Sequence, residues 1–369
     1  PCPANGSVVG GRLHGPGRDQ EVRGWVRNGG VAITTFDSLG WFADRSDAIS
    51  PACVVVDEAH YVKNPQTLRS QRAVALIEES PRALLLTGTP LENRVEEFRN
   101  LASYVRPDLL VDAPDFAPKR FRRQIAPAYL RRNQEDVLAE LPELVEVEEW
   151  LPLSADDRVA YGRAVVDGNF MAMRQAALLA GRASQKVQRL LEIVDEAEAN
   201  GRRVIVFSYF REVLSRLAQL VPTPVFGPVT GSVPAPARQA VVDAFSGAVG
   251  GAVLLAQVVA GGQGLNIQAA SVVVICEPQL KPTLETQAIA RAHRMGQVRS
   301  VQVHRLLSEE GADRRIKEIL TEKQRLFDEF ARDSDMGLAA PEALDVTDAE
   351  LARRVIDEER ERLAKEQRK

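Results

Sequence analysis

The sequence predicts an α/β protein with two parallel-sheet lobes, a helical connector between them and a charged helical tail. Short apolar runs alternate with helical stretches along the 369 residues, which is the pattern of βα units. Many of these runs place Val, Ile and Leu at consecutive positions, as strands covered on both faces do. A chain of this length also exceeds one ordinary hydrophobic core, so about two domains and a tail are expected.

The expected strands form two sets, and a long helical region separates them. The strand candidates are Val31–Thr35, Ala52–Val56 and Ala83–Thr87, followed by Val204–Ser208, Ala252–Ala256, Val272–Cys276 and Val301–Leu306. The helical region covers about residues 154–200. Ser154 and Asp157 have the spacing of a capping box at its start, and Asn200-Gly201 provides a stop at its end.

Charge and cysteine content exclude several classes of protein. The 47 Lys and Arg residues against 51 Asp and Glu give a net charge of −4, so overall basicity does not indicate nucleic-acid binding. Cys2, Cys53 and Cys276 are widely separated and odd in number. We therefore expect no disulfide framework and no structural zinc, and a reducing, cytoplasmic compartment. No apolar run approaches the ~20 residues of a membrane span, so no membrane partner is expected. The tail has no strand pattern and predicts one solvated helix over residues 348–367.

Two adjacent carboxylates, Asp57 and Glu58, directly follow an apolar strand candidate. Such a pair is costly unless a cation or a reaction uses it, and the carboxyl ends of strands are where α/β sheets bind ligands. Asp57 is placed to hold Mg²⁺ through water. Glu58 is placed to orient and deprotonate a water that attacks a γ-phosphate. An acidic strand end that opens a surface helix is the alternative interpretation.

Three segments in order carry a resemblance to a known family: DEAHYVKN at 57–64, LLLTGTPLEN at 84–93 and QAIARAHRMGQ at 287–297. They resemble motifs II (the DEAH box), III and VI of the Swi/Snf-type ATPases of helicase superfamily two. Four further segments are similar to the family's bridge after the first lobe, its motif IV, the segment that follows and its motif V. These segments are residues 131–142, 204–210, 230–245 and 260–266.

The resemblance covers about residues 13–320 and implies two RecA-like lobes. Residues 1–150 would form a first, ATP-binding lobe that is incomplete at its N-terminus and carries a helical protrusion. Residues 151–180 would form the connector, 181–330 the second lobe with motifs IV to VI, and 331–369 the charged helical tail.

The resemblance also implies roles for individual residues. Arg291 and Arg294 match arginine fingers that act on ATP across the cleft, and they would share one face if the segment is helical. Residues that match cross-cleft coupling positions are His60, Thr87, Gly88, Thr89 and Gln287. Glycines that match the nucleotide-binding motif V are Gly261, Gly262 and Gly264.

Nucleic-acid contacts are expected at two places in the first lobe. Thr34 and Thr35 resemble a motif near the DNA track, where hydroxyls and amides hold phosphates; a purely structural strand end is the alternative. Residues 119–132 hold six basic residues and no acidic one. Such a stretch, with Arg120, Arg122 and Arg123, can grip a phosphate backbone, although a solvated protrusion would look the same.

Two departures from the family pattern stand out. Val258-Val259 occupy positions where many relatives carry polar residues. No Gly-x-x-x-x-Gly-Lys-Ser/Thr loop is present, because none of the eight lysines follows a glycine. The phosphate-binding loop is therefore expected upstream of Pro1, and residues 1–369 are expected to be inactive alone.

The function implied by the resemblance is ATP hydrolysis with Mg²⁺ in the cleft between the lobes, driving translocation along double-stranded DNA. DNA-bound proteins would then be remodelling targets. The low share of lysine among the basic residues suggests a high-GC bacterial genome, and hence an enzyme associated with the bacterial nucleoid. Two alternatives remain: a non-catalytic DNA- or protein-binding module derived from such an ATPase, and an RNA helicase.

Overall fold

A computed structural model describes residues 10–13, 17–43, 51–87, 95–110, 125–130, 141–261, 265–332 and 348–366. The described residues divide into two compact units. Unit 1 consists of those up to Leu130, and unit 2 consists of those from residue 141 onward. No helix in these ranges is long and apolar enough to cross a membrane.

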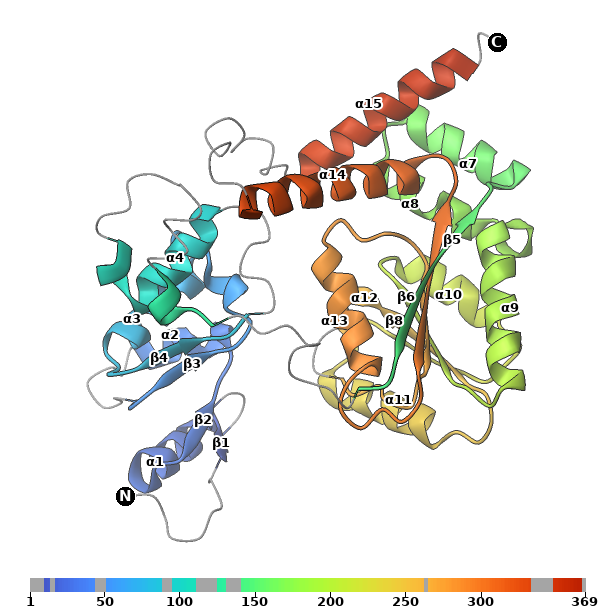
Figure 1. The fold of residues 1–369 in the computed structure, drawn as a ribbon. Coiled ribbons are helices and arrows are strands. Elements are labelled where there is room, and N and C mark those ends of the chain that lie inside the picture. The colour runs from blue at the N-terminus through green and yellow to red at the C-terminus, as the bar shows by residue number, and fades with distance from the viewer. Residues whose placement is uncertain are drawn as a thin grey trace. The chain divides into compact units, whose positions relative to one another are not determined.

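Unit 1 contains two small parallel sheets with helices between their strands (Figure 1). In the first sheet, β1 (Gly10–Arg12) pairs with β2 (Val31–Ile33), and α1 (Arg18–Asn28) connects them. In the second, β3 (Val54–Val56) pairs with β4 (Ala83–Leu85). The remaining elements are η1 (Phe36–Ser38), α2 (Leu39–Ala43), η3 (Ala59–Val62), α3 (Leu68–Glu78), α4 (Val95–Val105), η4 (Pro107–Leu110) and η5 (Ala126–Ala128). Each strand is three residues long, shorter than the five-residue runs that the sequence predicted.

The core of unit 1 is small and leaves apolar strand residues exposed. Val56, Ala59 and Val62 pack against α2, α3 and α4. Val55 and Leu84, on neighbouring strands, are 56% and 51% exposed. The expectation of strands covered on both faces therefore does not hold for the described part of unit 1.

Unit 2 is built on one six-stranded parallel sheet in the order β5-β10-β9-β6-β8-β7. Its strands are β5 (Leu144–Leu151), β6 (Val204–Ser208), β7 (Val225–Val229), β8 (Val253–Gln257), β9 (Val272–Ile275) and β10 (Val301–Ser308). One face packs on α9 (Gln185–Ala199) and α10 (Arg211–Leu220), and the other on α11 (Ala235–Gly247), α12 (Val258–Gly261) and α13 (Pro282–Ala292). Along β6, Val204 and Val206 face one helical layer while Ile205 and Phe207 face the other. The continuous apolar strands predicted for this half are confirmed.

The predicted helical region is divided into three helices. Its start is confirmed: the Asp157 backbone N–H donates to Ser154 Oγ, and the Ser154 N–H donates to Asp157 Oδ2, both at 3.1 Å. The helices are α7 (Ala155–Val166), α8 (Phe170–Leu179) and α9, with the short η6 (Gly181–Ala183) before the last. Asn200 caps α9, as expected.

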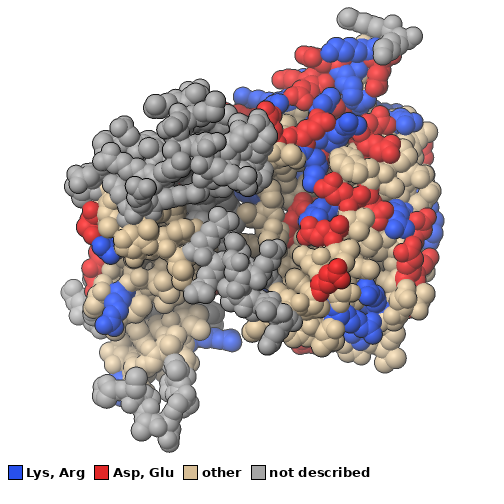
Figure 2. All heavy atoms as spheres, viewed as in Figure 1, with Lys and Arg blue, Asp and Glu red and all other residues tan. Residues whose placement is uncertain are grey.

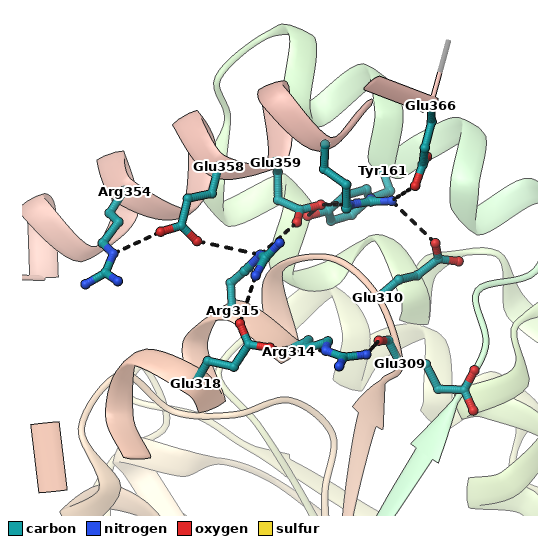
Figure 3. A network of polar contacts seen from close by, with 11 residues as sticks. Tyr161, Glu309, Glu310, Arg314, Arg315, Glu318, Arg354, Glu358, Glu359 and Glu366 are labelled. Carbon is teal, nitrogen blue, oxygen red and sulfur yellow. Dashed lines mark hydrogen bonds and ion pairs between the residues drawn. The ribbon is translucent and has the colours of Figure 1, made fainter. Parts of the chain in front are cut away.

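The tail helix α15 (Asp348–Glu366) begins where the sequence predicted, but it is not solvated all round. Leu351 and Val355 are buried in a cluster with α7, α8 and α14 (Ala312–Arg332). Polar contacts also hold it, because buried Glu359 accepts from Tyr161 Oη at 3.1 Å and pairs with Arg362 at 2.8 Å (Figure 3). The predicted solvated helix is therefore corrected to a packed part of unit 2.

Candidate active site

The candidate catalytic carboxylates lie in a tight turn at the carboxyl end of β3. Asp57 Oδ1 accepts the backbone N–H of Glu58 at 2.9 Å. Glu58 has φ 49° and ψ 50°, the left-handed region, and no other non-glycine residue in the described ranges has a positive φ. This conformation costs a non-glycine residue ~1–2 kcal/mol and concentrates at functional sites. The turn is thus a strained feature at the place where ligands meet a parallel sheet.

The strained backbone brings the Glu58 side chain close to His60. Glu58 Oε2 lies 3.3 Å from His60 Nδ1, and neither atom has an aligned hydrogen-bond partner in the described residues. The His60 ring stacks on Tyr61, with ring centroids 4.3 Å apart. The Glu58 side chain as a whole is 38% exposed, although its Oε2 atom is buried against His60.

Hydrogen bonds place this turn next to the end of β4. The Leu86 N–H donates to Val56 O and the Ala59 N–H donates to Leu86 O, both at 2.8 Å. Thr87 follows Leu86 directly, so the first residue of the predicted coupling motif lies beside the Asp57-Glu58 turn.

The residues around Asp57 fit a hydrated Mg²⁺ ion. Asp57 is exposed, and one of its carboxylate oxygens accepts the N–H described above. Mg²⁺ keeps several waters and uses one or two carboxylates together with substrate phosphates. The described residues contain no cluster of three His, Cys, Asp or Glu side chains able to cage a metal.

The predicted arginine fingers lie at the end of α13 in unit 2. The helix ends at Ala292, and His293 has ψ 83°, outside the helical region. Arg291 is thus in the last helical turn while Arg294 lies beyond the helix. The segment is not helical as far as Arg294, so the condition for a shared helical face is not met. Arg294 is exposed, whereas Arg291 is half-buried.

The loop after α13 is fixed by its own buried side chains. Gln297 Nε2 donates to the carbonyls of Gln268, Ala270 and Ala292 at 3.0, 2.9 and 3.1 Å. His293 Nε2 lies 2.7 Å from Pro142 O. These bonds fix the backbone on both sides of Arg294. The exposed Arg294 side chain therefore extends from a well-defined backbone position.

Other predicted residues have more local roles in the structure. Thr34 Oγ1 donates to Leu13 O at 3.2 Å, and Thr35 Oγ1 lies 3.1 Å from Ser38 Oγ. Gln287 is half-buried on α13, and Gly261 ends the short helix α12. The remaining predicted residues lie outside the described ranges: Gly88, Thr89, Arg120, Arg122, Arg123, Gly262 and Gly264.

Sequence reasoning missed a polar network at the carboxyl ends of the unit 2 strands. Glu277, fully buried after β9, accepts from Ser208 Oγ at 2.9 Å and from the Tyr209 N–H at 2.6 Å. Burial raises the pKa of Glu277, and nearby Arg174 opposes that rise. Gln257 Nε2 donates to Tyr209 O at 2.9 Å, and its Oε1 accepts the Gly231 N–H at 3.4 Å.

The network joins the loops after four strands. Gln257 and Glu277 lie at the ends of apolar strands, the signal that identified Asp57 and Glu58. A broader signal, any polar side chain directly after an apolar strand candidate, would have found both. The network gives the edge of unit 2 that carries motifs IV and V a defined shape.

The chain is similar to known proteins in sequence and in structure. A family model described as SNF2-related domain matches residues 12–202, more than half of the chain. A second, described as Helicase conserved C-terminal domain, matches residues 185–296.

Two curated relatives illustrate the similarity. The chain is 27% identical over 310 residues to an uncharacterized ATP-dependent helicase of Mycoplasma genitalium, covering 74% of this chain and 30% of the relative. It is 27% identical over 325 residues to the mouse SWI/SNF-related matrix-associated actin-dependent regulator of chromatin subfamily A member 1, covering 74% and 31%. The chain therefore spans about a third of the length of these relatives.

A solved structure of the SWI2/SNF2 ATPase core of Sulfolobus solfataricus in complex with dsDNA is also similar. It is 24% identical to this chain and overlaps with a TM-score of 0.42, covering 91% of this chain and 80% of that one.

Proposed function

Because the chain belongs to the SNF2-related domain family, whose curated relatives include ATP-dependent helicases, we propose that it is part of a Mg²⁺-dependent ATPase that moves along duplex DNA. Hydrolysis would use residues of both units on one phosphate chain. Translocation would proceed without strand separation, and DNA-bound proteins would be displaced or remodelled as the enzyme advances.

The proposal gives each reactive side chain one task. Asp57 would hold Mg²⁺ through water, and the ion would supply positive charge to the phosphates. Glu58 would orient the attacking water and accept its proton, and His60 would hold the Glu58 carboxylate in position. Arg291 and Arg294 would stabilise the charge that spreads over the transferring phosphoryl group, for which planar guanidinium groups are suited.

The observation that carries the proposal is the Asp57-Glu58 turn. A left-handed glutamate costs stability and is retained where the surrounding structure requires it. Here it directs the Glu58 carboxylate to His60, with Oε2 3.3 Å from Nδ1, while 38% of the Glu58 side chain stays exposed. A merely structural strand end does not need a strained residue whose carboxylate is held against a histidine.

Residues 1–369 alone are expected to show no DNA-stimulated ATP hydrolysis. No lysine of the chain follows a glycine, so the sequence lacks the loop whose amides and lysine position the phosphates in this class of site. Positioning supplies most of the catalysis in phosphoryl transfer. Robust turnover by these residues would show that phosphates are held in another way.

The test uses a longer protein that contains these residues together with a phosphate-binding loop. Glu58→Gln should leave ATP affinity unchanged and lower kcat by ~10²–10⁴-fold, because glutamine keeps the size of the side chain but cannot act as a general base. Glu78→Gln, an exposed glutamate at the end of α3, is the matched control and should keep wild-type turnover. Loss of ATP binding in Glu58→Gln would make Glu58 a structural residue.

The choice of nucleic acid separates the alternatives. Stimulation by duplex DNA supports the translocase, and stimulation by RNA alone would support an RNA helicase. An intact phosphate loop with no turnover under either condition would support the non-catalytic module.

A further inference from the structure

A recess lies in unit 2 at the edge where strands β6 and β9 begin, opposite the carboxyl ends that carry motifs IV and V. Its volume is about 320 Å³, at the lower end of the range for small-molecule sites. Its lining includes Arg203, Arg299, Ser271 and Gln297, and none of its nine lining residues is acidic. The lining of the recess therefore carries a net positive charge.

Arginine side chains at the recess are incompletely satisfied by the protein. Arg203 Nη2 donates to Ala248 O at 2.6 Å, but its buried Nε has no acceptor in the described residues. Arg299 Nη1 donates to Gly201 O at 3.0 Å. Neither forms an ion pair with any carboxylate of the described chain. Within the described residues, the two guanidinium groups bond only to backbone carbonyls, and Arg299 is also exposed to solvent.

A third arginine lies next to Arg203 in the chain, although it is not part of the recess lining. Arg202 precedes Arg203 in the chain, and its Nη2 reaches Ser300 Oγ at 3.4 Å, a long contact. Its buried Nη1 has no acceptor among the described residues. Two buried guanidinium N–H groups in adjacent residues are thus without acceptors, although buried donors are normally paired.

The backbone holds these side chains in fixed positions. The N–H groups of Ser271 and Val272 both donate to Arg203 O, at 3.1 and 3.2 Å. Arg299 in turn bonds to Gly201, two residues before Arg203. The recess therefore combines Arg203, which directly precedes β6, with Arg299, an exposed residue of the loop before β10.

We propose that this recess binds a phosphate group. Guanidinium forks pair with phosphate oxygens through charge-assisted hydrogen bonds, and a tetrahedral anion offers acceptors in several directions at once. The Ser271 hydroxyl, which lines the recess, provides a neutral hydrogen-bonding group. The phosphate could belong to a nucleic-acid backbone or to a free phosphate compound, and the two sources predict different results.

The first experiment uses inorganic phosphate and the 369-residue chain. Phosphate at constant ionic strength should raise the melting temperature of the wild-type chain relative to chloride. Arg299→Gln should weaken phosphate binding about tenfold, the loss of one charge-assisted bond. Arg353→Gln, which removes an exposed arginine of α15, is the matched control and should respond like the wild type. Arg299→Lys should recover only part of the affinity, because it restores the charge without the fork.

The second experiment distinguishes the two sources. Duplex DNA binding by the same chain is measured over a range of salt concentrations. If a backbone phosphate fills the recess, the negative slope of log K against log salt should be less steep in Arg299→Gln than in Arg353→Gln, by about 0.9. An unchanged slope together with lost phosphate binding identifies a free phosphate compound. Identical phosphate responses of the wild type and Arg299→Gln, with equal slopes, would overturn the proposal. ATP turnover is not a readout, so this result is independent of the proposed ATPase function.

Discussion

The two units use the same βα chemistry, yet their sheets differ in how completely they are covered. In unit 2, Ile205 and Phe207 are fully buried within a six-stranded sheet. In unit 1, Val55 and Leu84 are more than half exposed on three-residue strands. Hydrophobic burial is the dominant stabilising contribution to folding, so unit 2 should be much the more stable of the two.

The comparison shows that precise placement of reactive groups does not require a large core. The Asp57-Glu58 turn is held by backbone hydrogen bonds to β4 and by the contact with His60. The segment that carries Arg294 instead rests on a fully covered sheet and on the three bonds of Gln297. The position of Asp57 and Glu58 therefore depends on local backbone geometry, whereas the position of Arg294 depends on the packing of unit 2.

The largest expected effect is on the rate of ATP hydrolysis, and it follows from removal of Arg294 in unit 2. In the longer ATPase, Arg294→Ala should lower kcat ~10³-fold or more with little change in DNA affinity, because the guanidinium acts on transition-state charge. Arg314→Ala, an exposed arginine on α14, is the control. Steady-state ATPase assays with duplex DNA measure the effect. Near-normal turnover would remove Arg294 from the proposed site.

Core truncations should separate the units by stability. Ile205→Ala removes buried methylenes from the central strand β6 and should destabilise unit 2 by ~2–5 kcal/mol. Val55→Ala, at a position 56% exposed, should cost at most ~0.5 kcal/mol. Hydrogen exchange of peptides from β6 and β3 measures both changes. Equal losses of stability in the two variants would mean that Val55 is covered in solution, and that the two sheets do not differ in how completely they are covered.

The predicted strands of unit 2 match the structure because their apolar runs are continuous, whereas the edge strands were missed. β5 contains three glutamates, which hide its strand pattern. Each of these pairs with a basic residue of a neighbouring element: Glu146 with Arg305, Glu148 with Lys317 and Glu149 with Arg189. At the other edge, Gly227 and Pro228 interrupt β7, and proline is tolerated there because an edge strand has free donors on one side. Contacts with residues distant in sequence therefore stabilise edge strands that the local sequence pattern does not predict.

The candidate site divides in a similar way. The sequence located Asp57, Glu58 and the arginines by residue type and order. It could not predict that Glu58 adopts a left-handed backbone, because that follows from the bonds of Val56 and Ala59 to β4. Nor could it predict that α13 ends before Arg294. Helix ends depend on tertiary contacts, here those of His293 and Gln297.

A third test concerns the tail, which packing and ion pairs attach to unit 2. On the face shown in Figure 2, basic and acidic side chains alternate over α14 and α15. Glu359→Ala should destabilise the docking of α15 by ~1–3 kcal/mol, because it leaves the buried Tyr161 hydroxyl without its acceptor. Glu361→Ala, at a side chain 74% exposed, should change little. Hydrogen exchange of α15 is the measurement, and equal protection in both variants would restore the solvated-helix interpretation.

The smallest effect tests the polar network of unit 2 through its pH dependence. Burial raises the pKa of Glu277 above its ordinary value, so the folded state holds a proton that the unfolded state has already released. The free energy of unfolding should therefore fall as the pH rises from the ordinary glutamate pKa through the raised one, and then stay constant. Glu277→Gln removes this titration while keeping an oxygen for the Tyr209 N–H and an amide toward Ser208.

The measurement is the free energy of urea unfolding at a series of pH values. Pulse-labelling of β6 and β9 peptides at one fixed pH then reports on the strands next to Ser208 and Glu277. The wild type should lose stability relative to Glu277→Gln across this window. Glu212→Gln, an exposed glutamate on α10, should follow the wild type. The opposite sign, with the wild type gaining stability as the pH rises, would mean that Arg174 and Lys186 keep Glu277 ionised. The pKa of Glu277 would then be set by its buried cations and not by its burial, and the network would be an ionic cluster.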